Sequence, residues 1–132
     1  MRILIVEDSE TRLAFFRRQC DGHELAVADT AQGAIELLGK TEFDLVFLDH
    51  DLAEPIGTGR DVALHLRTSG RLKTPVIIHS MNLGAAEAMV RLLSRARAHP
   101  FALLKDMAIT RTPAEWVAEC LAMARTAVRL SP

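Results

Sequence analysis

The sequence lacks the features that mark secreted, disulfide-linked and membrane proteins. Its two cysteines, at positions 20 and 120, have neither a zinc-type spacing nor the density of a disulfide framework, so we expect reduced thiols and a cytoplasmic location. No apolar run approaches the roughly 20 residues that a membrane helix needs. Met1 leads directly into apolar residues without a basic segment, so we expect no signal peptide and no membrane partner.

The chain also has no excess of either charge. Its 16 lysine and arginine residues against 17 acidic residues give a formal net charge of −1, so no field of the whole molecule attracts nucleic acid. With 132 residues, 49% of them hydrophobic and 25% charged, the composition is that of one globular domain. No linker, repeat or low-complexity segment is visible, which predicts a single domain over 1–132 with no DNA-binding output domain.

Short apolar runs alternate with longer amphipathic segments along the chain. The runs predict strands over 2–8, 23–29, 43–49, 74–81 and 101–106, and the other segments predict helices over 9–20, 30–41, 59–70, 83–99 and 112–130. Thr112, Pro113 and Glu115 form the pattern of a capping box at the last helix. Five such units predict an α/β fold of the flavodoxin-like type: a five-stranded parallel sheet of order 2-1-3-4-5 with five helices on both faces.

Acidic side chains gather at the carboxyl ends of two strands that this order makes neighbours. Glu7 and Asp8 end the first strand, Asp49 ends the third, and Asp51 lies just beyond it. Like charges held so close raise one another's pKa unless a cation neutralises them. Oxygen ligands without cysteine favour a hard ion, Mg²⁺ first, so the sequence predicts a Mg²⁺ site at this edge.

Two further strand ends carry groups that suit a phosphate. The fourth strand ends at His79 and Ser80 and the fifth at Lys105, so a hydroxyl and an ammonium group flank the acidic cluster. Each acid alone could simply cap the following helix, but suitable residues at four strand ends favour a functional site. Regular strand alternation leaves open whether His79 reaches the site or packs under a helix.

The segments that carry these residues resemble the receiver domains of two-component signalling. The resemblance rests on "ILIVED", on the aspartate that ends "DLVFLD", on the serine after "PVIIH" and on the lysine after "FALL". It implies that Asp8 binds Mg²⁺ directly and Glu7 through water, and that Asp49 is both ligand and phosphoacceptor. It further implies a metal ligand in the backbone carbonyl of Asp51, a switch hydroxyl in Ser80 and a phosphoryl partner in Lys105.

Departures from that pattern point to a narrower resemblance. His50 stands where ordinary receivers have an apolar residue, and Ala53 and Asp106 stand where they have proline. The segments "LDHDL", "TGRDVALHLR" and "IIHSMN" instead resemble the receiver subfamily named for cyclic-phosphate processing. That resemblance implies the processing of cyclic phosphates on nucleotides or RNA ends, at a site made of Glu7, Asp8, Asp49, His50, Asp51, His79, Ser80, Asn82 and Lys105.

Two classes of function remain open at this point. One is a Mg²⁺-dependent cyclic phosphodiesterase or phosphohydrolase, in which His50, His79 or Asp51 protonates the departing oxygen and either Asp49 or metal-bound water attacks. Its partner would be a phosphate-bearing nucleotide or RNA end. The other is a stand-alone response-regulator receiver that a histidine kinase phosphorylates on Asp49 in a phosphorelay. A homodimer through helix faces is compatible with both, and His50 could equally do no more than hydrogen-bond a neighbouring carboxylate.

Overall fold

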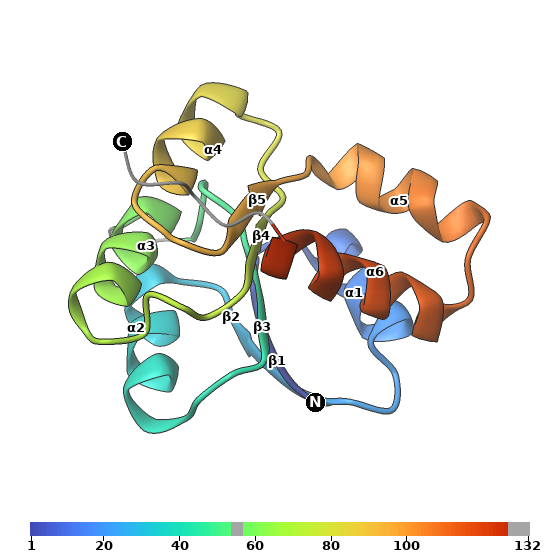
Figure 1. The fold of residues 1–132 in the computed structure, drawn as a ribbon, viewed down its shortest axis with the longest axis horizontal. Helices are drawn as coiled ribbons and strands as arrows, with labels where there is room; N and C mark the ends of the chain where they lie inside the picture. The colour runs from blue at the N-terminus through green and yellow to red at the C-terminus, as the bar shows by residue number, and fades with distance from the viewer. Residues whose placement is uncertain (54–56, 127–132) are drawn as a thin grey trace.

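The computed structural model describes residues 1–53 and 57–126, in which strands and helices alternate (Figure 1). The strands are β1 (Arg2–Val6), β2 (Glu24–Ala28), β3 (Leu45–Leu48), β4 (Val76–Ile78) and β5 (Ala96–Ala98). The helices are α1 (Glu10–Gln19), α2 (Ala31–Lys40), α3 (Gly59–Thr68), α4 (Leu83–Val90), α5 (Phe101–Ile109) and α6 (Pro113–Thr126).

The five strands form one parallel sheet in the order β2-β1-β3-β4-β5, which confirms the predicted topology. Along the central pair, Ile3 lies beside Leu45 and Val6 beside Leu48, so β1 and β3 end at the same level. β4 pairs with the other side of β3 and ends with Ile78 beside Leu48. The residues that follow β1, β3 and β4 therefore meet at one edge of the sheet.

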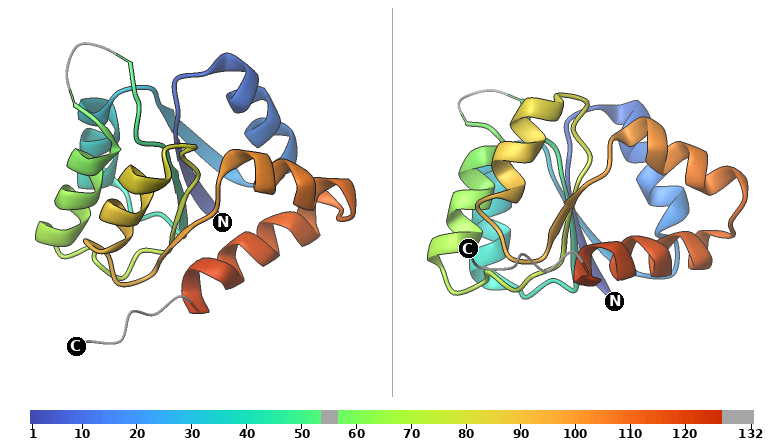
Figure 2. Two further views of the ribbon diagram at one scale, coloured as in Figure 1. Left: turned by 90° about the horizontal axis from the view of Figure 1, so that it is seen from above. Right: turned by 45° about the horizontal axis from the view of Figure 1, so that its top comes forward.

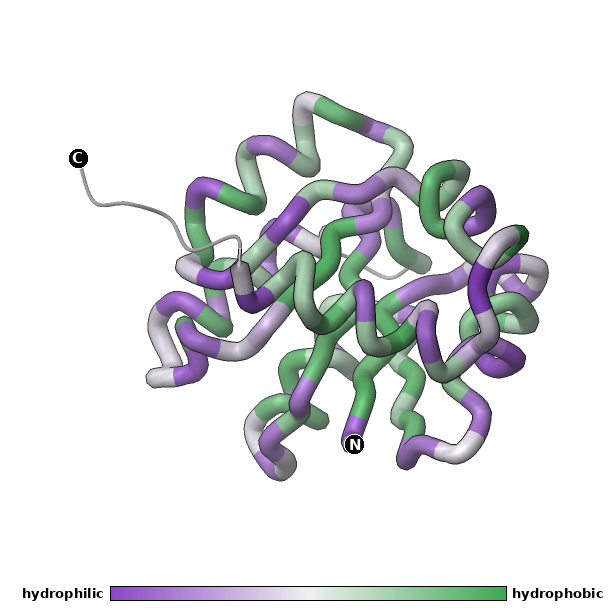
Figure 3. The backbone as a smooth tube through the Cα atoms, turned by 45° about the vertical axis from the view of Figure 1, so that its right-hand side comes forward, coloured by the Kyte–Doolittle hydropathy of each residue, from purple (hydrophilic) through white to green (hydrophobic). Residues whose placement is uncertain are grey.

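Helices cover both faces of the sheet, and each face has its own hydrophobic core (Figures 1 and 2). Leu4 and Val6 of β1 point towards α2, α3 and α4, whereas Ile3 and Ile5 point towards α1, α5 and α6. This alternation follows from the two-residue period of a strand. Because both faces are covered, β1, β3 and β4 are buried and hydrophobic over almost their whole length. In Figure 3, hydrophobic segments accordingly run through the middle of the molecule.

The last third of the chain differs from the prediction. Residues 101–106, predicted as the fifth strand, begin helix α5, and residues 83–99, predicted as one helix, contain both α4 and the short strand β5. Phe101 and Leu104 are buried three residues apart, which is the spacing of a helix and not of a strand. The described chain therefore has six helices, one more than expected.

The final helix begins as the sequence predicted. The Thr112 hydroxyl accepts a hydrogen bond from the Glu115 N–H at 3.2 Å, and the Glu115 carboxylate accepts one from the Thr112 N–H at 2.9 Å. Trp116 follows, fully buried, and its indole N–H donates to the Leu104 carbonyl at 2.8 Å, which ties α6 to α5. Residues 127–130 of the predicted helix lie outside the described residues.

No helix in the described part of the chain combines the length and the apolar composition that crossing a membrane requires. Cys20 and Cys120 are both buried and free in the core between α1 and α6, as expected from their positions in the sequence.

Candidate functional site

A cavity of about 340 Å³ opens at the carboxyl edge of the sheet, where β1, β3 and β4 end. Its walls carry four carboxylates, one guanidinium group, two hydroxyls and an amide. Among the described residues, these groups and two apolar side chains come from Glu7, Asp8, Ser9, Arg12, Asp49, Asp51, Leu52, Ser80, Met81 and Asn82.

Asp49 lies on the floor of this cavity because it directly follows the buried strand β3. Its backbone N–H donates to the Val6 carbonyl at 3.1 Å, and the residue is 4% exposed. The carboxylate accepts a hydrogen bond from the His50 N–H at 2.8 Å. Burial raises the pKa of Asp49; Glu7 adds to this effect, whereas His79 opposes it.

Glu7 lies beside Asp49, and every oxygen of its carboxylate has a partner. One oxygen, Oε2, accepts from the backbone N–H groups of Asp8 and Ser9 at 2.9 and 3.0 Å. The other, Oε1, accepts from His79 Nε2 at 2.9 Å. Burial alone would raise the pKa of Glu7, but these hydrogen bonds and the charge of Arg12 outweigh it and lower the pKa to about 2.

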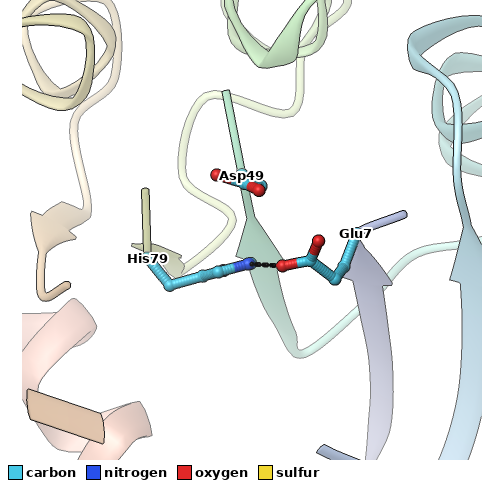
Figure 4. A group of neighbouring side chains, drawn as sticks. All are labelled: Glu7, Asp49 and His79. Carbon is cyan, nitrogen blue, oxygen red and sulfur yellow. Dashed lines mark hydrogen bonds and ion pairs between the residues drawn. The ribbon is translucent and has the colours of Figure 1, made fainter. Parts of the chain in front are cut away.

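His79 is fully buried and does not line the cavity. Its ring points towards Glu7 (Figure 4). The ring also packs edge-on against Phe16, with the ring centroids 5.0 Å apart. In the described part of the chain its Nδ1 has no hydrogen-bond partner. The structure thus places His79 behind Glu7, beneath a helix, as the alternation of β4 allowed.

His50 and Asp51 form a pair on the rim. His50 Nδ1 lies 3.0 Å from Asp51 Oδ1, and the Asp51 side chain is 80% exposed. Asp51 lines the cavity, whereas the imidazole of His50 does not. Asp8, also an exposed residue, completes the acidic rim. Partial desolvation of its carboxyl group, together with the neighbouring Glu7 carboxylate, raises the pKa of Asp8.

Ser80 and Asn82 form the wall that follows β4. The Ser80 hydroxyl is buried and accepts a hydrogen bond from the Asn82 N–H at 3.0 Å. Asn82 is the N-cap of α4, because its side chain accepts from the Ala85 N–H at 3.1 Å. Both residues line the cavity, so Asn82 combines the capping position with a place in the cavity wall.

Lys105 is not at the end of a strand, and the prediction of its place was wrong. It lies exposed on α5 and does not line the cavity. The residue that follows β5 is His99, whose pKa is lowered by burial and by Arg97. His99 does not line the cavity either. No strand end of the described chain therefore supplies the expected ammonium group.

The sequence analysis missed Arg12, which supplies a positive charge at this site. Its Nη1 lies 3.5 Å from Asp49 Oδ2 and 3.6 Å from Glu7 Oε1. The residues predicted from the sequence follow strand ends, whereas Arg12 lies in the first turn of α1. Arg12 lies three residues after the helix cap Ser9, which places it in the first turn of the helix that follows β1. The first turn of such a helix faces the same edge of the sheet as the end of the strand, so the sequence did contain a signal for Arg12.

Gly59 was also missed, although it positions Asp49. The Gly59 N–H donates to the His50 carbonyl at 2.8 Å, and α3 begins here. A Cβ atom at this position would lie 1.9 Å from the Asp49 carbonyl oxygen, which only a glycine avoids. Gly57, two residues earlier, has φ +115° and lies before the helix.

The residues present fit a divalent cation. Glu7, Asp49 and His79 each offer one ligand atom, and these atoms all lie within 4.8 Å of one another. Asp8 and Asp51 add carboxylates on the cavity rim. Carboxylate oxygens are the ligands that Mg²⁺ prefers, and Mn²⁺ accepts them together with imidazole nitrogen.

A comparison with known families shows to which family this chain belongs. A family model described as the cyclic-phosphate processing receiver domain matches residues 2–95, which is more than half of the chain. The chain belongs to this family. No curated protein matches it significantly.

Solved structures of response-regulator receiver domains share the fold of this family member. The receiver domain of a putative Luxo repressor from Vibrio parahaemolyticus superposes with a TM-score of 0.68 at 21% identity, over 95% of this chain and 92% of that one. The Francisella response regulator 1452 receiver domain gives 0.67 at 18% identity, over 95% and 97%. The Mn²⁺-bound form of response regulator Rcp1 gives 0.66 at 17% identity, over 99% and 96%.

Proposed function

We propose that this receiver domain processes cyclic phosphates on nucleotides or RNA ends, with Asp49 as the carboxylate that reacts with phosphorus. The observation that carries the proposal is the position of Asp49 on the floor of a cavity whose rim holds Asp51 and whose wall holds Ser80. Membership of the cyclic-phosphate processing family supports the choice of substrate class. A cavity of about 340 Å³ suits a phosphate with part of its sugar.

A divalent ion, Mg²⁺ by the resemblance, would be held by Asp8 and Asp49, with Glu7 beside them. When bound, it would neutralise charge on the phosphate oxygens. The hydrogen bonds that Glu7 accepts from His79 and from two backbone N–H groups fix its carboxylate in place. A Mn²⁺-bound response regulator among the structural relatives supports a divalent ion here.

The residues of the chain can account for both halves of a ring-opening hydrolysis. In the first, an Asp49 oxygen bonds to phosphorus while the bond from phosphorus to one ribose oxygen breaks. The His50–Asp51 pair donates the proton that this oxygen needs, since Asp51 lies on the rim and His50 shares a hydrogen bond with it. In the second half, water attacks phosphorus, the Asp49 carboxylate is released, and the pair recovers a proton from the water.

A second candidate function is a stand-alone receiver that accepts a phosphoryl group on Asp49 from a histidine kinase. It is favoured by one specific observation: neither His50 nor His79 lines the cavity, although both were candidates for acid catalysis. A phosphoacceptor needs the carboxylate, a metal ion, the Ser80 hydroxyl and a cation, and no imidazole.

The experiment that separates the two functions measures turnover and phosphorylation on the same proteins. Purified wild type, Asp49→Asn and His50→Ala are incubated with Mg²⁺ and 2′,3′-cyclic nucleotides or RNA with a cyclic-phosphate end, and product is followed by chromatography. Asp21→Asn is the matched control, because Asp21 is an exposed acid beyond the far end of α1. Parallel samples receive acetyl phosphate, and phosphorylation is read by mass spectrometry.

We expect turnover by the wild type and by Asp21→Asn, none by Asp49→Asn, and a strong loss in His50→Ala. If no cyclic phosphate is opened while acetyl phosphate labels the wild type and not Asp49→Asn, the hydrolase proposal is wrong and the receiver remains. If neither reaction depends on Asp49, both functions fail.

A further inference from the structure

One positive charge faces the acidic cavity. Among the described residues that line it, Arg12 is the only basic one, against Glu7, Asp8, Asp49 and Asp51. Its side chain is 30% exposed, so its guanidinium group is in contact with both the cavity and the solvent. A negatively charged phosphate is repelled by four carboxylates unless cations are present, and a single divalent ion would neutralise only half of them.

The guanidinium of Arg12 is held from behind by an aromatic ring. Its central carbon lies 5.1 Å from the centroid of the Phe101 ring, within the range of a cation–π interaction. Phe101 is 8% exposed and packs edge-on against Phe15, with centroids 5.3 Å apart. A guanidinium stacked on a ring keeps its N–H groups free at the edge, where they can bind oxygen.

The guanidinium group of Arg12 lies near two carboxylate oxygens but forms no short hydrogen bond with either. Its Nη1 lies 3.5 Å from Asp49 Oδ2 and 3.6 Å from Glu7 Oε1, whereas a charge-assisted hydrogen bond is typically about 2.8 Å long. One nitrogen thus bridges two carboxylates loosely. A phosphoryl group at Asp49 would place its oxygens next to the same guanidinium.

We propose that Arg12 is the phosphate-binding cation of this site, taking the role that the resemblance assigned to Lys105. Its guanidinium binds non-bridging oxygens of the phosphoryl group held at Asp49, and Phe101 keeps it there. The inference rests on the proposed function only in that Asp49 handles a phosphoryl group, whether from a cyclic phosphate or from a phosphodonor. Phe101 comes after residue 95, where the match to the family model ends.

The test uses beryllofluoride, which imitates a phosphoryl group on an aspartate, in the presence of Mg²⁺. Binding is measured by ¹⁹F NMR for wild type, Asp49→Asn, Arg12→Gln, Arg12→Lys and Lys105→Gln. Arg17→Gln is the matched control, since Arg17 is exposed on the same helix and lies 4.0 Å from Glu10. Mn²⁺ binding without beryllofluoride is measured on the same proteins by electron paramagnetic resonance, and circular dichroism checks their folding.

We expect Arg12→Gln to bind beryllofluoride at least about tenfold more weakly, since a charged hydrogen-bond donor is lost. Its Mn²⁺ affinity should be equal to or higher than that of the wild type, because a neighbouring cation has gone. Arg12→Lys should recover part of the affinity for beryllofluoride. A purely structural Arg12 would lower the melting temperature without this selective loss.

If Arg12→Gln binds beryllofluoride as tightly as the wild type, the proposal is overturned. A loss of beryllofluoride binding in Lys105→Gln would then assign the role to Lys105. Failure of the proposed function has a different signature: the wild type itself would bind no beryllofluoride, or Asp49→Asn would bind as well as the wild type. That result would overturn both ideas together.

Discussion

His79 Nε2 lies 2.9 Å from Glu7 Oε1, and at most 1% of either side chain is exposed. Since β1 and β4 flank β3, this hydrogen bond spans the strand that carries Asp49 (Figure 4). A buried carboxylate and a buried imidazole are each costly alone, and their mutual bond offsets part of that cost. The pair therefore fixes the three strand ends relative to one another.

Replacing His79 by a residue without an imidazole should destabilise the folded protein. We expect His79→Phe, which keeps an aromatic ring against Phe16, to lower the free energy of unfolding by about 3 kcal/mol, because Glu7 loses a buried partner. Urea denaturation followed by circular dichroism measures the change. The double variant Glu7→Gln/His79→Phe should lose much less than the sum of the single variants. A loss below about 0.5 kcal/mol in His79→Phe would mean that the pair does not stabilise the fold.

Glu7 should make the protein sensitive to acid. Its pKa of about 2, against an ordinary value of 4.5, means that the folded state binds the proton more weakly than the unfolded chain. Its contribution to stability is therefore complete above pH 4.5 and is lost as the pH falls towards 2, by about 3 kcal/mol in total. We expect the free energy of unfolding of Glu7→Gln, measured in urea with EDTA, to fall less between pH 5 and pH 3 than that of the wild type. Parallel slopes for the two proteins would contradict this.

Gly59 should tolerate no side chain. The Cβ of Gly59→Ala would lie 1.9 Å from the Asp49 carbonyl oxygen and 2.9 Å from Met89 Cε, so the start of α3 or Asp49 itself must move. We expect a loss of about 2 kcal/mol or more in urea denaturation, together with weaker Mn²⁺ binding. Gly39→Ala is the control: it lies exposed in α2 with nothing within 4 Å, and alanine should stabilise that helix by about 0.5–1 kcal/mol. Similar stabilities for the two alanine variants would refute the close approach.

The two thiols should be inert in the folded protein. Cys20 and Cys120 are fully buried; burial raises the pKa of Cys20 to about 12 and raises the pKa of Cys120 as well. We expect no reaction with Ellman's reagent at pH 8 on the timescale of minutes, and two reactive thiols per chain in denaturant. Reaction in native buffer at the rate of a free thiol would show that the core between α1 and α6 opens readily.

The sheet could be predicted from the sequence because β1, β3 and β4 are continuous apolar runs, as expected of strands covered on both faces, and β2 is a weaker apolar run. The fifth could not. β5 is Ala-Arg-Ala, three residues without a β-branched side chain at the edge of the sheet, and the more apolar segment after it was mistaken for the strand. The burial of Phe101 and Leu104 three residues apart is a helical period that a six-residue run hardly reveals.

The acidic part of the site was predictable for the same reason as the sheet, since strand ends converge once the strand order is known. Arg12 could have been found only from its place in the first turn of the helix after β1, and Gly59 not at all, because the role of each depends on how a helix packs against a strand end. Arg12 reaches Asp49 across the top of β1, and Gly59 touches the Asp49 backbone through the start of α3. Such contacts between elements distant in sequence leave no periodic pattern.

The ring of Phe101 beneath Arg12 has a consequence for evolution and for engineering. A fragment that stops at Pro100 would keep every carboxylate of the cavity but would lose the ring that holds Arg12 and shields His79. On this proposal, mutations in α5 would change the affinity of the site for an anion without changing the residues at the strand ends. If Arg12 binds the phosphate as proposed, α5 sets the affinity for it while the carboxylates stay in place, so α5 is the first segment to randomise when binding of a different phosphorylated compound is sought.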